Sequence, residues 1–206
     1  MDITIFKDSC MKDDADIIVQ KYLIDGASFF FDTIKVGQEF EFKKNIARSL
    51  DVHIRDIAIV GSGKLGFSIK PDRDTSGFYP FKKFDFDYEQ DIENKKSDLD
   101  IAIVSSQLFD KQLVKIYDHT DSYRSSDYQG KPKNSFASYI LKGWFRPDFI
   151  PNNYSITDDI SNVQDKYRAE YGRDINIGIY KSWYFFEKYH INNVNSIKLN
   201  LFLASS

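Results

Sequence analysis

Three short apolar stretches of the chain predict β-strands. Residues 56–60 and 99–104 contain continuous runs of Ile, Val and Ala, and residues 174–180 alternate strictly between isoleucine and a polar or small residue. Continuous β-branched runs are typical of buried strands, and strict alternation is typical of a strand with one apolar face. The chain is therefore expected to form a sheet from its middle and its last third.

Apolar residues recurring every three to four positions predict helices around these strands. In the clearest case, residues 38–50, Phe42, Ile46 and Leu50 form one buried stripe. The stripe of Ile160, Val163, Tyr167 and Tyr171 predicts another helix, which Thr157 would cap. The remaining pattern predicts a short strand at 3–6, helices at 14–23, 106–117 and 135–145, and two C-terminal helices at 182–190 and 193–203.

The first strand runs into the glycine turn Gly61-Ser62-Gly63-Lys64. Such a turn offers a hydroxyl and free backbone N–H groups, which together can hold phosphate oxygens. These four residues are therefore the predicted nucleotide-binding residues.

Two other phosphate-binding motifs fit this turn poorly. Residues 61–66 match G-x-G-x-x-G, but that fingerprint needs a helix after its third glycine, and the following residues 67–71 end in Pro71. A Walker A loop fails because Ala58 stands at its first glycine position and Leu65 at the position of the Ser or Thr.

Two acidic residues open the second strand. Asp98 and Asp100 are two positions apart, so their side chains project from the same face. Neighbouring carboxylates repel each other unless a divalent cation neutralises them, and oxygen ligands favour Mg²⁺ or Mn²⁺. The sequence thus predicts a metal site near a phosphate-binding turn, the combination that nucleotide chemistry requires.

The two motifs together resemble the nucleotidyltransferases of the DNA polymerase beta superfamily, in the small bacterial form G-S-x-x-x-G … S-D-x-D. The resemblance covers residues 37–180. It implies an α+β fold with a polymerase-beta-like core, in which helices pack on a twisted mixed β-sheet and additional C-terminal helices follow. Residues 1–206 would form a single nucleotidyltransferase domain, with the catalytic core at 37–180 and the C-terminal helices at 181–206.

The spacing between the motifs departs from the family. Minimal members place the acidic pair about a dozen residues after the Gly-Ser turn, whereas Asp98 follows Gly61 by 37 positions. Residues 71–96 are therefore expected to be an insertion loop. Its sequence Phe84-Asp85-Phe86-Asp87 repeats the alternating acid pattern, but no apolar run follows to make a central strand.

The family carries a third acid on another strand, and Asp174 is our candidate. It opens the alternating strand on the small polar face, which would bring it beside the acidic pair. The competing interpretation is a surface acid that merely begins a strand. Asp148 and Asp165 are the alternative candidates.

The resemblance implies nucleotidyl transfer with two metal ions. Asp98 and Asp100 would bind both cations, about 3.5–4 Å apart at the α-phosphate, and Asp174 would bind the cation that activates an acceptor hydroxyl. The backbone of residues 61–63 and the Ser62 hydroxyl would hold the β- and γ-phosphates, and Lys64 could add positive charge. Pyrophosphate would leave, and a nucleoside monophosphate would stay on the acceptor.

Composition and charge restrict the partners and the cellular location that we expect. A chain of 206 residues with 42% hydrophobic content can bury a substantial core, and its single cysteine excludes internal disulfides. The net charge of −3 gives no general attraction to long nucleic acid. The chain shows no secretory signal and no long apolar run, so we expect a cytoplasmic protein without a membrane partner.

The acceptor stays open at this stage. The donor would be a nucleoside triphosphate, with ATP as first choice. The family permits a protein hydroxyl, an RNA end, a small molecule such as an aminoglycoside, or a second nucleotide as acceptor. The chain is short for the last of these, because synthases that join two nucleotides usually carry a larger helical lobe. By analogy, small bacterial members imply a toxin–antitoxin or phage-defence system, with a protein partner encoded nearby.

Two other functions compete with transfer. A non-catalytic nucleotide- or partner-binding module on the same fold is favoured by the insertion and the unsettled third acid, and opposed by the intact Ser62, Asp98 and Asp100. A metal-dependent phosphohydrolase would normally add histidines to the same acids, and the three histidines of this chain have no metal-like spacing.

Overall fold

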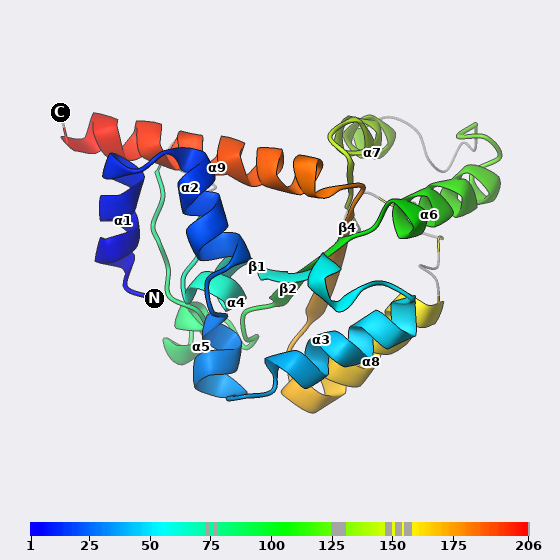
Figure 1. The fold of residues 1–206 in the computed structure, drawn as a ribbon, viewed down its shortest axis with the longest axis horizontal. Helices are drawn as coiled ribbons and strands as arrows, with labels where there is room; N and C mark the ends of the chain where they lie inside the picture. The colour runs from blue at the N-terminus through cyan, green and yellow to red at the C-terminus, as the bar shows by residue number, and fades with distance from the viewer. Residues whose placement is uncertain are drawn as a thin grey trace.

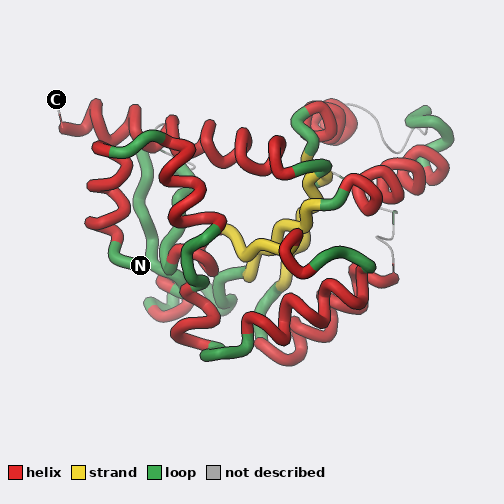
Figure 2. Tube along the Cα trace, in the orientation of Figure 1, coloured by secondary structure: helices red, strands yellow, loops and turns green. Residues whose placement is uncertain are grey.

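A four-stranded mixed β-sheet crosses the middle of the molecule (Figures 1 and 2). The computed structural model describes residues 1–72, 75, 78–124, 131–146, 150, 154 and 158–205. The strand order is β1-β2-β4-β3, with β2 parallel to β4 and both outer pairs antiparallel. The strands are β1 (Ile57–Val60), β2 (Leu99–Val104), β3 (Trp144–Phe145) and β4 (Ile175–Tyr180).

Helices surround this sheet, so the described chain is an α+β protein, as the sequence predicted. Two of its short helices, η1 and η2, are π-helices, and η3 is a 3₁₀-helix. In chain order the helices are α1 (Ile3–Lys12), α2 (Ala15–Ile18), η1 (Val19–Ile24), η2 (Phe30–Ile34), α3 (Glu39–Leu50), η3 (Ile54–Asp56), α4 (Gly61–Leu65), α5 (Phe86–Glu89), α6 (Ser106–His119), α7 (Lys131–Leu141), α8 (Asp158–Tyr171) and α9 (Trp183–Ser205).

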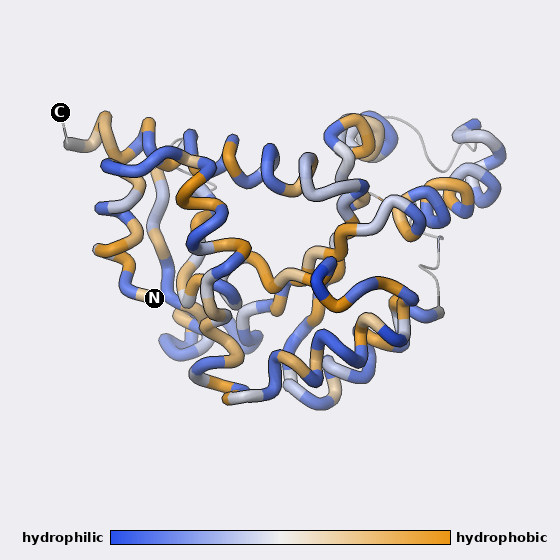
Figure 3. Tube along the Cα trace, viewed as in Figure 1, coloured by the Kyte–Doolittle hydropathy of each residue, from blue (hydrophilic) through white to orange (hydrophobic). Residues whose placement is uncertain are grey.

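One face of the sheet is lined by large aliphatic residues and carries the main core. Helices α3 and α8 lie side by side on this face (Figure 1) and bury the two stripes that the sequence predicted. Along the chain, apolar residues gather on the strands and alternate with polar ones on the helices (Figure 3). The strand residues of this core are Ile57, Ile59, Leu99, Ile101, Ile103, Ile175, Ile177 and Ile179.

The opposite face of the sheet is built from small residues at its centre. Ala58, Ala102 and Gly178 occupy neighbouring register positions there. Farther along the strands, Tyr180 packs against Phe186 at the start of α9. Because these side chains are small, Trp144 can pack closely on this face, where its indole nitrogen lies 2.7 Å from the position of a Cβ on Gly178.

A second apolar cluster joins the two ends of the chain to the segment after the Gly-Ser turn. Helices α1, α2 and η1 pack against α9, as Figure 1 shows. Phe67 and Phe81, which follow the Gly-Ser turn in the chain, belong to this cluster. Both make edge-to-face ring contacts with Phe6 of α1. The first part of the insertion is therefore fastened to the N-terminal helices.

Three sequence predictions of secondary structure are wrong. Residues 3–6 form helix α1, because the Asp2 carboxylate accepts hydrogen bonds from the N–H groups of Thr4 and Ile5 and caps it. The helix predicted at 135–145 ends at Leu141, since Gly143 turns the chain with φ +65° into β3. The two C-terminal helices are one, α9. The predicted cap Thr157 lies outside the described residues.

His190 of α9 should make the protein less stable in acid. The imidazole is 7% exposed among aromatic rings, with Phe186 4.5 Å away between centroids, and neither ring nitrogen has a hydrogen-bond partner within the described residues. This burial lowers the pKa of His190 to about 4. The unfolded chain therefore takes up a proton near pH 6.5 while the folded chain does not, so stability falls as the pH drops from about 6.5 to about 4.

The shift corresponds to a loss of about 3 kcal/mol in the free energy of unfolding across that pH range. Urea titrations at pH 7.5 and pH 4, followed by circular dichroism, measure it. The control is His190→Phe, which fills the same space without a titrating group. Parallel pH dependence of the variant and the parent chain would contradict the prediction.

Within the described residues, none of the helices has both the length and the apolar character that a membrane crossing requires.

Candidate functional site

The acidic pair lies at the end of β2, beside β4. Asp100 is paired in register with Asn176 of β4 on one side and with Val60 of β1 on the other. Asp98 immediately precedes β2, and its side chain is 39% exposed. The parallel pairing of β2 and β4 is the arrangement that the proposed third acid required.

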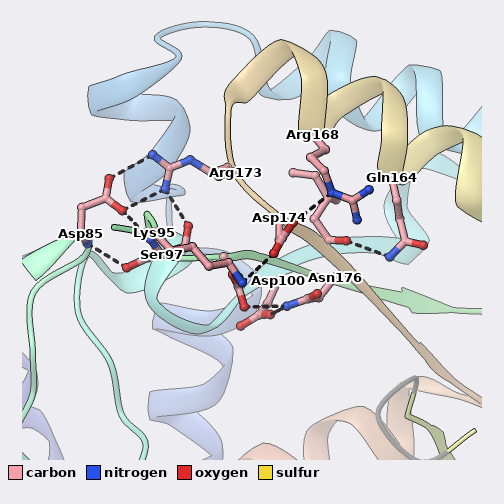
Figure 4. Close-up of polar contacts among 11 residues, drawn as sticks. Asp85, Lys95, Ser97, Asp100, Gln164, Arg168, Arg173, Asp174 and Asn176 are labelled. Carbon is pink, nitrogen blue, oxygen red and sulfur yellow. Dashed lines mark hydrogen bonds and ion pairs between the residues drawn. The ribbon is translucent and has the colours of Figure 1, made fainter. Parts of the chain in front are cut away.

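Asn176 holds the two carboxylates together (Figure 4). Its Nδ2 lies 3.1 Å from Oδ2 of Asp98 and 3.0 Å from Oδ1 of Asp100, and it donates to both. Because one amide nitrogen reaches both side chains, the carboxylates converge on one point. The described residues therefore confirm the geometric expectation that Asp98 and Asp100 share a face.

The Gly-Ser turn lies directly beside Asp100. Gly61 begins α4 with φ +64°, and a Cβ at this position would lie 2.8 Å from Oδ2 of Asp100. A side chain at position 61 would thus collide with the carboxylate, so glycine allows the close approach. Ser62 follows in the first turn of α4, where backbone N–H groups have no partner within the helix.

The other two residues of the predicted phosphate-binding turn point into the protein. A Cβ on Gly63 would lie 2.7 Å from Cδ1 of Leu99, so Gly63 serves close packing of α4 on the sheet. The Lys64 ammonium group is buried and donates to the backbone carbonyls of Ile24 and Gly26. Burial lowers the pKa of Lys64. In this structure Lys64 connects α4 to the segment after η1.

Asp174 lies beside the pair but is held by two cations. Its carboxylate is 2.6 Å from Nζ of Lys95 and 2.9 Å from Nε of Arg168 (Figure 4). The hydrogen bond from Lys95, followed by that from Arg168, keeps the pKa of Asp174 below its usual value. Lys95 also lies 3.4 Å from Oδ1 of Asp98 and so connects the two acids.

The fallback acids are placed differently. Asp165 is 68% exposed and pairs with Arg168 at 2.6 Å, and this arginine links it to Asp174. Asp148 lies outside the described residues.

The insertion is closed just before Asp98 by a buried ion pair. Asp85 and Ser97 exchange two backbone-to-side-chain hydrogen bonds, at 2.9 and 2.8 Å. Arg173 donates to both carboxylate oxygens of Asp85, at 3.1 and 3.0 Å, and to the carbonyl of Ser97 (Figure 4). Residues 85–97 therefore form a closed loop that returns the chain to the start of β2. The alternating acids at 84–87 are not a strand, and Asp85 has this structural role.

A cavity of about 470 Å³ opens beside Asp174 on the β4 side of the acidic pair. We call it the basic pocket, because four cationic side chains line it together with Asp174 and Tyr88: Lys95, Lys96, Arg168 and Arg173. Lys96 lies over the Tyr88 ring, 5.5 Å from its centroid. Arg173 is neutralised by Asp85, so Lys95, Lys96 and Arg168 are the cations that the pocket presents beside Asp174.

Aromatic residues lie on the same sheet face as Asp100. Trp144 of β3 stacks on Tyr180 with 5.3 Å between ring centroids, and its indole nitrogen occupies the space that a Cβ on Gly178 would need. Gly178 is two residues beyond Asn176 on β4. Trp144 is therefore packed against the sheet, near the acidic pair.

The two carboxylates fit a divalent cation in their donor chemistry, because carboxylate oxygens are ligands of Mg²⁺, whereas Asn176 presents its Nδ2 to them. The described residues contain no group of three His, Cys, Asp or Glu side chains placed to hold a metal ion. Asp98 and Asp100 are thus the acidic donors that the structure brings together, with Asn176 as a neutral neighbour.

Sequence reasoning missed Asn176 and the basic pocket. Asn176 shares a face with Asp174 in the alternation, but only the register with β2 shows which of the two lies opposite Asp100. The pocket combines residues 88–96 with residues 168–174, which the fold brings together.

Comparisons of the chain with models of protein families, with characterised proteins and with solved structures found no significant match.

Proposed function

We propose that this chain is a metal-dependent nucleotidyltransferase that moves a nucleoside monophosphate from a nucleoside triphosphate to a hydroxyl acceptor. The observation that supports it best is the convergence of Asp98 and Asp100 on Asn176, directly beside Gly61. A pair of carboxylates next to a phosphate-binding turn is the minimal apparatus for this reaction. The polymerase-beta-like core and a cytoplasmic location belong to the same proposal.

Each residue has a role that follows from its position. Asp98 and Asp100 provide carboxylate oxygens for Mg²⁺ or Mn²⁺, and Asn176 holds these carboxylates in place. A divalent cation bound there supplies positive charge at the α-phosphate and lowers the pKa of the acceptor hydroxyl. The backbone of Gly61 and the hydroxyl of Ser62 hold the β- and γ-phosphates.

Asp174 is part of the proposal on one condition. Its carboxylate is engaged by Lys95 and Arg168, so it can act on the acceptor only when another anion takes these two cations. The same contacts favour the alternative function, a non-catalytic nucleotide- or partner-binding module, because they neutralise the candidate third acid. The setting in a toxin–antitoxin or phage-defence pair rests on the sequence resemblance alone.

Label transfer tests the function. Purified protein is incubated with each α-³²P-labelled nucleoside triphosphate, Mg²⁺ or Mn²⁺, and fractions of a cell extract. We expect label in one fraction, lost with EDTA and lost in Asp98→Ala/Asp100→Ala. The labelled fraction then identifies the acceptor class. Binding of the triphosphate without any transfer of label would support the non-catalytic module instead.

A further inference from the structure

We propose that the basic pocket binds the phosphate group of a nucleotide that serves as the acceptor. This inference rests on the proposed transferase function and adds the acceptor class to it. It is carried by the charge of the pocket, by its place on the sheet and by its size.

The charge of the pocket selects an anion. Lys95, Lys96 and Arg168 line it beside a single acid, Asp174, whereas the fourth lining cation, Arg173, is buried and already paired with Asp85. Lys95 and Arg168 have exposed side chains, 60% and 50%, and both point to one carboxylate that a phosphate could replace. A phosphate offers more acceptor oxygens and more negative charge than Asp174, and charge-assisted hydrogen bonds to it are strong. A polycationic acceptor such as an aminoglycoside would be repelled.

The place of the pocket separates it from the donor triphosphate. Gly61 follows β1, on one side of β2, while Asp174 precedes β4, on the other side. The acidic pair at the end of β2 therefore lies between the Gly-Ser turn and the basic pocket. An anion in the pocket approaches the acids from the side opposite to the triphosphate, which is where an acceptor has to enter for in-line displacement.

The size and lining of the pocket suit a mononucleotide. A cavity of about 470 Å³ is within the range of small-molecule sites. Tyr88 contributes an aromatic ring that is 42% exposed, and nucleobases stack on such rings. A phosphate on the cations and a base on Tyr88 would both lie within this lining.

Acceptor binding would also release Asp174. When the phosphate takes Lys95 and Arg168, the Asp174 carboxylate becomes available to receive the proton of the acceptor hydroxyl. The hydroxyl oxygen then forms a bond to the α-phosphorus, the bond from that phosphorus to the β-phosphate oxygen breaks, and pyrophosphate leaves with the bonding electrons. The nucleotide acceptor thereby completes the site that it uses.

Calorimetric titration of 5′-AMP tests the pocket directly. The protein is first saturated with Mg²⁺ and α,β-methylene-ATP, so that the donor position is filled with a compound that cannot be cleaved. We expect 5′-AMP to bind, and adenosine to bind at least about tenfold more weakly, because the pocket recognises the phosphate.

The variant Lys95→Gln/Lys96→Gln should weaken 5′-AMP at least about tenfold and leave the ATP analogue within about threefold. The matched control is Lys12→Gln/Lys111→Gln, which also removes two charges; Lys111 is 50% exposed and pairs with Asp159 at 3.7 Å. Lys12 is 69% exposed and pairs with Asp8 at 2.6 Å, as Lys95 pairs with Asp174, but it lies on α1. Equal binding of AMP and adenosine, or no effect of the double variant, would overturn the proposal. Equal weakening of AMP and the ATP analogue would assign the pocket to the donor and overturn it too.

Two further experiments complete the test. The first distinguishes failure of the pocket from failure of the transferase function, and the second distinguishes a free nucleotide from an RNA end as the acceptor. If the ATP analogue does not bind, the titration is repeated without it. AMP binding that needs Lys95 and Lys96 then supports the pocket even though the transferase function fails. A short oligoadenylate that binds through the same lysines at least about tenfold more tightly than AMP identifies the acceptor as an RNA end.

Discussion

Replacement of Asp100 by asparagine is expected to reduce nucleotide transfer by at least about 10³-fold and to leave the fold intact. Asp100 sits inside β2, touches the Gly61 position and accepts from Asn176, so it is the acid with the most fixed position. Asparagine keeps the size of the side chain and removes the charge that a divalent cation needs. Transfer is measured on the acceptor fraction found by label transfer, and Mn²⁺ binding is measured by electron paramagnetic resonance.

Two companion variants make this prediction specific. Asp174→Asn should cost about 10²-fold in transfer, the contribution of a general base, and should change Mn²⁺ binding little. Asp165→Asn is the matched control, because Asp165 pairs with the same Arg168 but lies outside the acidic pair. Its transfer rate should equal that of the parent chain. Full activity of Asp100→Asn would contradict the proposed metal site.

Replacement of Arg173 by methionine is expected to lower the free energy of unfolding by about 3–5 kcal/mol. The guanidinium is 3% exposed and lies between the rings of Phe30 and Phe84, 5.0 and 4.7 Å from their centroids. Methionine can fill much of this space, but it leaves the nearly buried Asp85 carboxylate, 12% exposed, without its bidentate partner. An uncompensated buried charge is the main cost.

The second variant, Arg173→Met/Asp85→Asn, tests the cause. Asparagine removes the charge, tolerates the φ of +62° at position 85 and can still accept the hydrogen bond from the Ser97 backbone. The double variant should therefore recover a substantial part of the lost stability. Urea denaturation of the parent, both single variants and the double variant measures the coupling. Additive losses would contradict the interpretation of a coupled ion pair.

The sequence predicted β1, β2, β4 and the core helices α3 and α8, because one local pattern determined each, but it assigned the short strand β3 to a helix. In β2, β4 and α3 the buried apolar residues follow the spacing expected for a strand or a helix. The predictions at 3–6 and at the C-terminus failed where other interactions outweighed the pattern. A capping Asp2 favours helix over the β-branched residues of α1, and burial of Val194 and Ile197 keeps α9 continuous through Asn192 and Asn193.

The candidate site was predictable only in part. Asp98, Asp100 and Gly61 carry local signatures, and the structure places them together. The contact of Asn176 with Asp100 could not be predicted, because strand register depends on residues far apart in the sequence. The basic pocket could not be predicted, because its cations come from two separate segments and each segment alone has the sequence of an ordinary charged surface.

The parallel pairing of β2 with β4 also determines when the site can form during protein synthesis. Asp100 and Asn176 are 76 residues apart in the chain. At about 5–20 residues per second, the ribosome needs roughly 4–15 s to add that interval. During this time β2 has only β1 as a partner, and the nascent chain carries its two acids without the strand that orients them. The order of synthesis would thus delay assembly of the proposed transferase site until β4 has emerged.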